Sequence, residues 1–323
     1  MANSDKALLS KYLTKILNSK VYDVVKETPL DEAVSLSRKF GAKFLLKRED
    51  LQSVHSFKIR GAYNKMSQLP AEVLAKGVLA ASAGNHAQGV ALSAKRLGCK
   101  ATIVMPVTTP DIKVNAVKGH GAQVVLAGDS YSDAAEEAAR LVKERKLTFI
   151  PPYDDEDVIA GQGTVALEIL EQEPEIDTIV VPIGGGGIAT GVALAAKSVN
   201  PAIRVYGVQT EACPAMVASI ADGVCYEEYP IGETLCDALV GGVGRLSYEM
   251  LPGLLDDILV VKEETVRRAA AFLLTEEKFV IEAGSATTVA AVWDHPEKFT
   301  GKKTALILTG GNIDGETIRK VLG

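Results

Sequence analysis

The sequence lacks the features that would assign it to several common classes of protein. It has four cysteines in 323 residues, with no C-x-x-C spacing and no histidine placed to complete a zinc site, so we expect reduced thiols and no metal. It has no basic cluster, and its net charge of -6 argues against a nucleic-acid partner. No apolar run approaches transmembrane length. The sequence therefore predicts a soluble, cytoplasmic protein that binds neither nucleic acid nor a membrane.

Alternating strand and helix patterns occupy most of the chain. Strands are expected at 43–47, 77–81, 101–105, 122–126, 147–150, 178–183, 204–208 and 304–308, and most of them are followed by a helical pattern. This alternation is typical of parallel strands covered by helices on both faces. It predicts an α/β protein with two lobes built on open, twisted parallel sheets. We expect a large domain at 1–50 and 151–323, a small domain at 51–150, and a cleft between them.

Lys58 is the first candidate for a functional side chain. Apolar residues between 59 and 66 recur with helical spacing, and Ser56 is expected to cap the start of that helix. Lys58 would then lie in the first helical turn beside Phe57, where the helix dipole and the apolar surroundings lower the pKa of the amine. A neutral amine can form a Schiff base. The alternative is a solvated surface lysine, which is the commoner case for a lysine considered alone.

Four consecutive glycines, Gly184, Gly185, Gly186 and Gly187, follow a predicted buried strand and precede a helix. Without side chains their amides can approach an anion closely, and phosphate is the natural ligand at a helix N-terminus. No Lys-Ser/Thr pair follows, which excludes a nucleotide triphosphatase loop. A dinucleotide site stays open, because Gly184, Gly186 and Ala189 fit G-x-G-x-x-A and Glu211 follows. A tightly packed turn without a ligand is a further alternative.

A second loop with small residues lies between a predicted strand and a helix. Its amides could hold a carboxylate, and its polar side chains could contact the same ligand. The residues are Ser82, Ala83, Gly84, Asn85 and His86. The alternative is a polar helix cap with His86 on the surface. Thr309 is a third candidate, because its hydroxyl follows a parallel strand at the edge where ligand sites of α/β proteins cluster.

Six segments, taken together and in this order, resemble the threonine/serine dehydratase and serine racemase family. They are Ser56–Ala62 (SFKIRGA), Ser82–Gly89 (SAGNHAQG), Pro151–Asp154 (PPYD), Gly161–Thr164 (GQGT), the tetraglycine, and Gly310–Asp314 (GGNID). The resemblance runs over nearly the whole chain. It implies the tryptophan-synthase-β fold type (fold type II), pyridoxal 5'-phosphate as the cofactor, and a large domain that binds it.

The resemblance also implies a role for each candidate. Lys58 would form the Schiff base with pyridoxal phosphate and then act as the base at the substrate Cα, while Phe57 would pack against the ring. Gly184 to Gly187 would hold the phosphate, and Asn85 would hydrogen-bond the ring hydroxyl. The amides from Ser82 to His86 would hold the substrate carboxylate. Thr309 would face the pyridine nitrogen, where a hydroxyl cannot maintain protonation, an arrangement that suits β-elimination.

Departures from the family narrow the expected activity. Family racemases have a serine where this chain has Ala83, which favours an ammonia-lyase acting on L-threonine or L-serine. Glu211 matches a metal-binding glutamate of some members, but the acidic residue that should follow it is absent, so no metal is expected. The loops at 236–238 and 282–285 also differ, which leaves the substrate side chain open.

Several alternatives remain at this stage. They are an amino-acid racemase, a lyase for another 3-hydroxy amino acid such as hydroxyaspartate, a nicotinamide dehydrogenase built on the glycine fingerprint, and a non-catalytic pyridoxal-phosphate carrier. The resemblance further implies a homodimer or homotetramer. Because the chain ends soon after Asn312, we expect no C-terminal regulatory domain.

Overall fold

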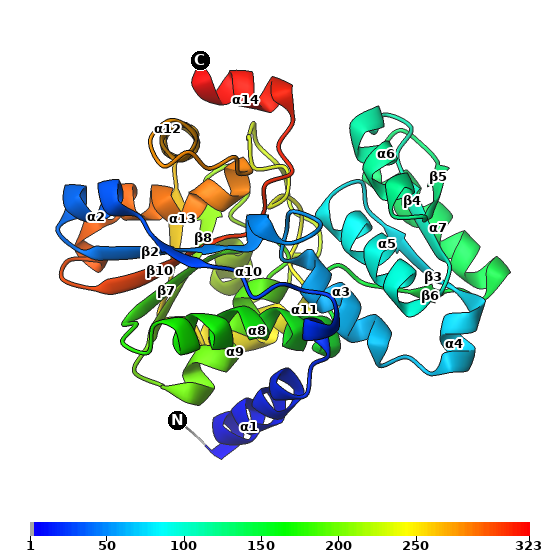
Figure 1. Cartoon of the computed structure of the whole chain (residues 1–323), viewed down its shortest axis with the longest axis horizontal. Coiled ribbons are helices and arrows are strands. Elements are labelled where there is room, and N and C mark those ends of the chain that lie inside the picture. The colour runs from blue at the N-terminus through cyan, green and yellow to red at the C-terminus, as the bar shows by residue number, and fades with distance from the viewer. Residues whose placement is uncertain (1–2) are drawn as a thin grey trace.

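The computed structural model describes residues 3–323, and its strands form two separate sheets (Figure 1). The six-stranded sheet has the order β1-β2-β10-β7-β8-β9, and every pair in it is parallel except β1 with β2. Its strands are β1 (Leu30–Glu32), β2 (Lys43–Arg48), β7 (Thr178–Pro182), β8 (Arg204–Thr210), β9 (Asp257–Val261) and β10 (Lys303–Leu308). β10 pairs with both β2 and β7, so a C-terminal strand lies in the middle of the sheet.

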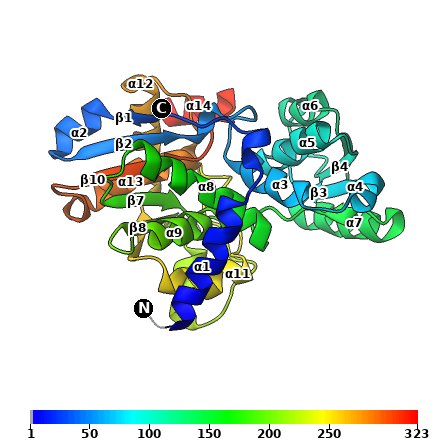
Figure 2. The same ribbon diagram turned by 60° about the horizontal axis from the view of Figure 1, so that its bottom comes forward.

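Helices cover both faces of the six-stranded sheet (Figures 1 and 2). On one face lie α1 (Asn3–Leu17), α8 (Glu156–Gln172), α9 (Gly187–Val199), α10 (Ala215–Asp222) and α11 (Arg245–Met250). On the other lie α2 (Val34–Phe40), α12 (Glu263–Thr275), α13 (Ala283–Asp294) and α14 (Gly315–Leu322). Strand β7 shows why two layers form: Ile179 and Val181 enter one core and Val180 the other, because side chains alternate along a strand. Short 3₁₀ helices occur at Val21–Asp23 (η1), Glu49–Leu51 (η2), Leu251–Gly253 (η3) and Pro296–Lys298 (η4).

The four-stranded sheet is parallel throughout, with the order β5-β4-β3-β6. Its strands are β3 (Val78–Ala81), β4 (Ala101–Met105), β5 (Gln123–Leu126) and β6 (Thr148–Phe149). The neighbouring helices are α3 (Lys58–Ser67), α4 (Ala71–Lys76), α5 (Asn85–Leu97), α6 (Asp111–Gly119) and α7 (Tyr131–Arg145). Helices α5 and α6 pack on one face and α7 on the other, so this sheet has its own two-sided core.

Helix α3 connects the two halves of the molecule, since it packs against α8 on one side and α5 on the other. The backbones of α3 and α8 approach so closely that only glycine, which has no Cβ, fits at position 161. A Cβ added to Gly161 would lie 2.7 Å from the carbonyl oxygen of Arg60 and 2.8 Å from the Cα of Gly61. This approach fixes the position of the helix that begins at Lys58.

A buried network of charged side chains joins α3 to the six-stranded sheet. Arg60 is fully buried, and its guanidinium contacts the Glu49 carboxylate at 2.7 Å and the Glu168 carboxylate at 2.6 Å. Lys47 Nζ also contacts Glu168, at 2.7 Å. Burial alone would raise the pKa of Glu49, but Arg60 outweighs it and holds that pKa below its ordinary value. The charges compensate one another, so removing one would leave its partners buried and unpaired.

The α/β fold class is confirmed, and the ends of each of the eight predicted strands agree with a strand of the structure to within two residues. The sequence patterns missed β1, which has only three residues, and β9. Helix α8 begins at Glu156, because the Asp155 side chain caps it by accepting hydrogen bonds from Asp157 N and Val158 N. The predicted division into a large and a small domain stays a prediction. Within residues 3–323 no helix is both long and apolar enough to cross a membrane.

The prediction that Ser56 caps α3 is wrong. Phe57 occupies the cap position, and no side chain there accepts a hydrogen bond from the helix amides. Ser56 instead pairs through its backbone with Gly310, while the amide of Phe57 donates to the carbonyl of Thr309 at 3.0 Å. Pairing with this distant segment fixes the backbone before the helix, and the buried Ser56 hydroxyl has no partner among the described residues.

Candidate functional site

The candidate segments follow the carboxyl ends of parallel strands, where ligand sites of α/β proteins lie. Gly184 follows β7 and Thr309 follows β10, and these two strands are neighbours in the six-stranded sheet. Ser82 follows β3 of the other sheet. Lys58 begins α3, whose first turn is joined to the end of β10 through Phe57 and Thr309. The fold therefore explains how segments far apart in the sequence can meet.

The environment of the Lys58 amine lowers its pKa strongly. Its Nζ donates to the carbonyl oxygen of Pro152 at 2.8 Å and lies 5.2 Å from the centroid of the Phe57 ring. Burial lowers the pKa of Lys58 to about 8, and the charge of Glu282 acts weakly in the opposite direction. The lowered pKa agrees with the prediction, although burial is its main cause rather than the helix dipole. Near neutral pH a minor fraction of the amine, far larger than for an ordinary lysine, is thus neutral and nucleophilic.

The tetraglycine lies close to Lys58, and Tyr153 connects the two. The Tyr153 ring centroid is 5.9 Å from Lys58 Nζ, and a Cβ added to Gly185 would lie 2.5 Å from atoms of the same ring. Gly186 adopts a positive φ of 96° at the start of α9, a conformation that side chains disfavour. The loop amides at the start of α9 make no backbone hydrogen bond within the described chain. They are free donors at a helix N-terminus, as phosphate binding requires.

Thr309 is buried beside a second hydroxyl. Its Oγ1 lies 3.1 Å from Ser285 Oγ, and Ser285 Oγ also donates to the Gly310 carbonyl and accepts from the Gly310 amide, both at 2.8 Å. These contacts fix the orientation of the Ser285 hydroxyl. Thr309 therefore presents a neutral, hydrogen-bonding group at the end of β10, and no carboxylate of residues 3–323 is bonded to it.

The loop from Ser82 to His86 is partly occupied by its own contacts. Ser82 Oγ accepts from the Gly84 amide at 3.3 Å, whereas the amides of Ala83, Asn85 and His86 have no acceptor in the part of the chain that the structure describes. His86 is buried, not on the surface as the alternative interpretation required. Its Nε2 lies 2.8 Å from the Ile150 carbonyl. Burial, reinforced by the charge of Lys58, lowers the pKa of His86 to about 3, so the ring is neutral.

Asn85 is the member of this loop that reaches the rest of the site. Its Nδ2 donates to the two carboxylate oxygens of Glu282, at 2.8 and 3.0 Å, and its Oδ1 accepts from Asn312 at 2.6 Å. Ser82, Ala83 and Gly84 make no hydrogen bond to Lys58, the tetraglycine or Thr309 among residues 3–323.

Sequence reasoning missed four side chains of the site: Tyr153, Glu282, Ser285 and Asn312. Two of them belong to segments that carried the family resemblance, Pro151–Asp154 and Gly310–Asp314, but no role followed from the pattern. Glu282 precedes α13 and Ser285 lies in its first turn, and this segment was recognised only by its difference from the family. Their positions depend on contacts between distant segments, so no local pattern could have found them.

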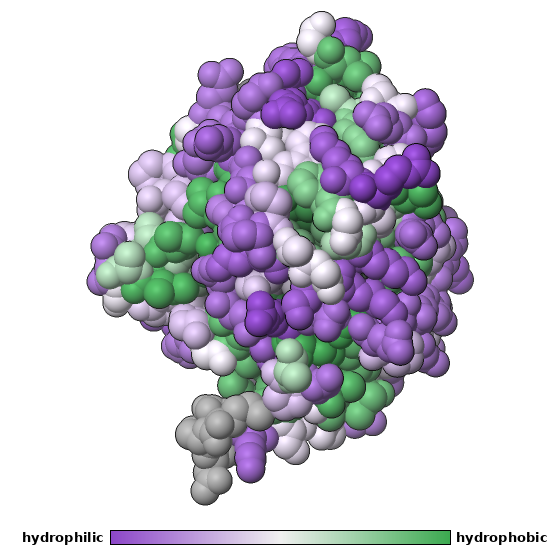
Figure 3. Space-filling view, turned by 90° about the vertical axis from the view of Figure 1, so that its left-hand side faces the viewer, coloured by the Kyte–Doolittle hydropathy of each residue, from purple (hydrophilic) through white to green (hydrophobic). Residues whose placement is uncertain are grey.

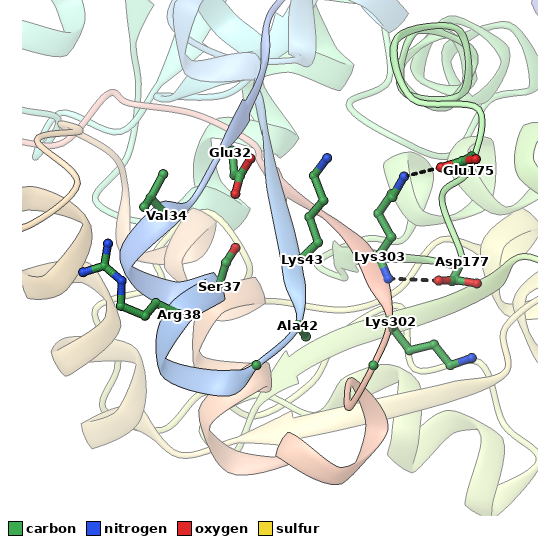
Figure 4. Close-up of a pocket in the computed structure, with 12 residues that line it drawn as sticks. Glu32, Val34, Ser37, Arg38, Ala42, Lys43, Glu175, Asp177, Lys302 and Lys303 are labelled. Atoms are coloured by element: carbon green, nitrogen blue, oxygen red, sulfur yellow. Dashed lines mark hydrogen bonds and ion pairs between the residues drawn. The ribbon is translucent and has the colours of Figure 1, made fainter.

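An open pocket lies elsewhere, at the amino ends of the strands. It has a volume of about 780 Å³ and includes Lys43 and Lys303, the first residues of β2 and β10 (Figure 4). Lys303 is already paired, with its Nζ 2.7 Å from Glu175 and its amide 2.9 Å from Asp177 (Figure 4). The corresponding end of the molecule is mainly hydrophilic (Figure 3). This pocket is at the opposite end of the sheet from Lys58.

The donor set around Lys58 fits a phosphorylated carbonyl cofactor. It combines a nucleophilic amine beside aromatic rings, free glycine amides for a phosphate, and a hydroxyl pair at the end of β10. Residues 3–323 contain no group of three or more His, Cys, Asp or Glu side chains that could hold a metal ion. A parallel α/β fold with this donor set suits the class of lysine-dependent pyridoxal-phosphate proteins.

Comparison with known proteins agrees with this class. Residues 21–310 match the family model described as "Pyridoxal-phosphate dependent enzyme". The chain is 44% identical over 301 residues to the L-threonine ammonia-lyase of Thermotoga maritima, covering 93% of this chain and 75% of that protein. It is 45% identical over 314 residues to a biosynthetic, chloroplastic threonine dehydratase of Solanum lycopersicum, covering 96% of this chain and 52% of the relative.

Solved structures agree as well. The processed form of threonine deaminase isoform 2 from Solanum lycopersicum superposes with a TM-score of 0.94 at 40% identity, covering 98% of this chain and 92% of that one. The chain belongs to the family of pyridoxal-phosphate-dependent enzymes. Fold type II and the pyridoxal phosphate cofactor are thereby confirmed, and the dinucleotide interpretation of the glycines loses its support. The chain spans only about half the length of the dehydratase relative from Solanum.

Proposed function

We propose that the protein is an ammonia-lyase that converts L-threonine or L-serine into a 2-oxo acid and ammonia. The observation that carries the proposal is the half-buried Lys58 amine, which lies 5.9 Å from the Tyr153 ring. The same ring packs against Gly185 of the loop whose amides suit phosphate, and the helix of Lys58 packs against the helix that begins at Asn85. The names of relatives that are about 45% identical, threonine dehydratase and L-threonine ammonia-lyase, support the same activity. In the overall reaction the substrate loses its β-hydroxyl and α-proton as water, and hydrolysis then releases ammonia.

Each candidate residue has a part in this proposal. When bound, pyridoxal phosphate makes the α-proton of an amino acid acidic. Lys58 would attach the cofactor and then move the proton at the substrate Cα, which its lowered pKa permits. Gly184 to Gly187 would bind the phosphate and Phe57 would pack on the ring. Thr309 would offer a hydroxyl to the ring nitrogen, and Asn85 an amide to the ring hydroxyl.

The loop from Ser82 to His86 would bind the substrate. The free amides of Ala83, Asn85 and His86 would bind the substrate carboxylate, with Ser82 and Gly84 shaping the turn. We further propose that residues 1–50 and 151–323 form the large cofactor-binding domain and 51–150 the small one. A cytoplasmic homodimer or homotetramer is the assembly that the family resemblance supports.

The test is 2-oxo acid release by purified protein loaded with pyridoxal phosphate and given L-threonine and L-serine in parallel. Lys58→Ala should lower kcat by at least about 1,000-fold and abolish the visible absorbance of the bound cofactor. The matched control is Lys118→Ala, an exposed lysine of α6, which should keep both. Activity that survives in Lys58→Ala would refute the mechanism.

Racemisation is the competing activity, and Ala83 argues against it because a methyl group cannot return a proton to the opposite face of the substrate Cα. Chiral analysis of unreacted substrate in the same assay separates the two. Unreacted L-serine should stay in the L form while pyruvate accumulates. D-serine appearing faster than pyruvate would make the protein a racemase.

A further inference from the structure

A buried carboxylate that the proposed mechanism does not use lies beside the site. Glu282 precedes α13 and is only 7% exposed. It accepts hydrogen bonds from Asn85 Nδ2 at 2.8 and 3.0 Å, and its Oε1 also accepts from the backbone amide of Asn312 at 2.9 Å. A buried carboxylate is costly unless it is well bonded, and here all these donors come from segments distant in the sequence.

The same contacts fix the orientation of the Asn85 side chain. Asn312 Nδ2 donates to Asn85 Oδ1 at 2.6 Å and to the Val54 carbonyl at 2.9 Å, so both of its hydrogens are used. Asn85 therefore has its oxygen toward Asn312 and its nitrogen toward Glu282. Turning the amide over would set two NH₂ groups against each other and its oxygen against the carboxylate. The network permits one orientation only.

In that orientation only one of the two N–H bonds of Asn85 Nδ2 is used by Glu282, so the other can donate to a ligand. The two oxygens of a single carboxylate subtend too small an angle at Nδ2 to take both hydrogens, so one hydrogen is shared between them. Glu282 also lies against the end of β10, because a Cβ added to Gly310 would be 2.8 Å from its Oε1. Asn85 begins helix α5, and this helix packs closely on the backbone of Lys58. A Cβ added to Gly89 of α5 would lie 3.2 Å from the carbonyl carbon and oxygen of Lys58.

Other charges also act on Glu282. They come from Asp237 and from Lys113, a residue of α6, and these two side chains pair with each other at 3.2 Å. Burial is the main influence and raises the pKa of Glu282, and Asp237 adds to the effect, whereas the bonds from Asn85 and Asn312 and the charge of Lys113 oppose it. The Glu282 charge in turn raises the pKa of Lys58. The carboxyl is thus electrostatically connected to the amine that attaches the cofactor.

We propose that Glu282 and Asn312 are positioning residues that hold the Asn85 amide with one N–H directed at the ring hydroxyl of pyridoxal phosphate. The inference rests on the proposed cofactor contact of Asn85. A fixed donor at that hydroxyl favours the form in which the oxygen carries the negative charge. Glu282 and Asn312 therefore control where the proton of the bound cofactor resides, which its absorption spectrum reports directly.

The test compares absorption spectra and cofactor dissociation constants of the loaded wild type, Glu282→Gln, Asn85→Ala and the double variant. Glutamine is nearly isosteric but can present an NH₂ group to Asn85. We expect Glu282→Gln to change the ratio of the visible to the near-ultraviolet band at least about threefold and to weaken cofactor binding about tenfold. In the Asn85→Ala background the same substitution should change either quantity by less than about twofold, because the two side chains act as one unit. Glu316→Gln, an exposed glutamate of α14, is the control and should match the wild type.

A wild-type spectrum and affinity in Glu282→Gln would overturn the inference. So would a double variant in which the fold-changes of the two single substitutions, in band ratio or in dissociation constant, simply multiply. If Glu282→Gln does not fold, Asn312→Ala provides the same comparison, since it removes the donor to Asn85 Oδ1 and leaves the carboxylate in place. The spectral readout is separate from lyase activity. If the Glu282→Gln spectrum is shifted but the protein releases no 2-oxo acid, this inference is supported and the proposed function is refuted. If the protein releases 2-oxo acid but the Glu282→Gln spectrum is unchanged, the proposed function is supported and this inference is refuted.

Discussion

Replacing Lys58 with methionine removes its titratable amine but keeps an unbranched side chain of similar length. In the cofactor-free protein, burial lowers the pKa of Lys58 from the ordinary lysine value of 10.5 to about 8. In the unfolded chain the amine keeps the ordinary value. Between pH 8 and pH 10.5 the unfolded state therefore binds more protons than the folded state, so this group makes the free energy of unfolding rise with pH. Below pH 8 the charged amine destabilises the folded protein.

The size of the effect follows from the same values. Each pKa unit corresponds to about 1.36 kcal/mol, which gives an upper limit of about 3 kcal/mol for the destabilisation. Lys58 is half-buried, and screening by water reduces this to about 2 kcal/mol. The variant also loses the 2.8 Å hydrogen bond to Pro152, which contributes about 1 kcal/mol at every pH. We expect Lys58→Met to be about 1 kcal/mol more stable than the wild type at pH 7 and to lose this advantage by pH 10.

The assay is urea unfolding of both cofactor-free proteins at pH 7, 8, 9 and 10. Taking the difference between them cancels the titration of all other groups that the two share. Lys118→Met, which replaces an exposed lysine, should show a difference from the wild type that does not vary with pH. A pH-independent difference for Lys58→Met as well would contradict this prediction, because the amine would then not titrate between pH 7 and pH 10.

The remaining predictions concern the glycine loop and the buried charges. Gly185→Ala should weaken cofactor binding at least tenfold in equilibrium dialysis, since its Cβ would lie 2.5 Å from the Tyr153 ring, whereas Gly253→Ala, with open space around it, should bind as the wild type does. Arg60→Met leaves two buried carboxylates without their guanidinium and should lower the free energy of unfolding by about 3–5 kcal/mol. Arg140→Met, on the exposed face of α7, should change it by less than about 0.5 kcal/mol, and equal stability of the two variants would show that the buried network is dispensable.

Local patterns in the sequence predicted the fold class, which the structure confirms, and the candidate site residues, which stay a prediction. Hydrophobic periodicity is set by the geometry of each strand or helix, so the alternation of strands and helices could be read without knowing their neighbours. The loops at Gly184, Ser82 and Thr309 could also be identified, because the carboxyl ends of parallel strands share one edge of a sheet. The lowered pKa of Lys58 followed from its apolar neighbours.

The contacts between distant segments were decided only by the tertiary structure. Ser56 has the side chain of a helix cap, yet its backbone pairs with Gly310 because β10 lies in the centre of the sheet. The bonds of Glu282 to Asn85 and Asn312 likewise join three loops that no periodicity connects. A local pattern records the preferences of neighbouring residues, whereas the partner of a buried polar group depends on which strands become neighbours. That choice is made by packing of the whole chain, and it determines how the side chains around Lys58 are held.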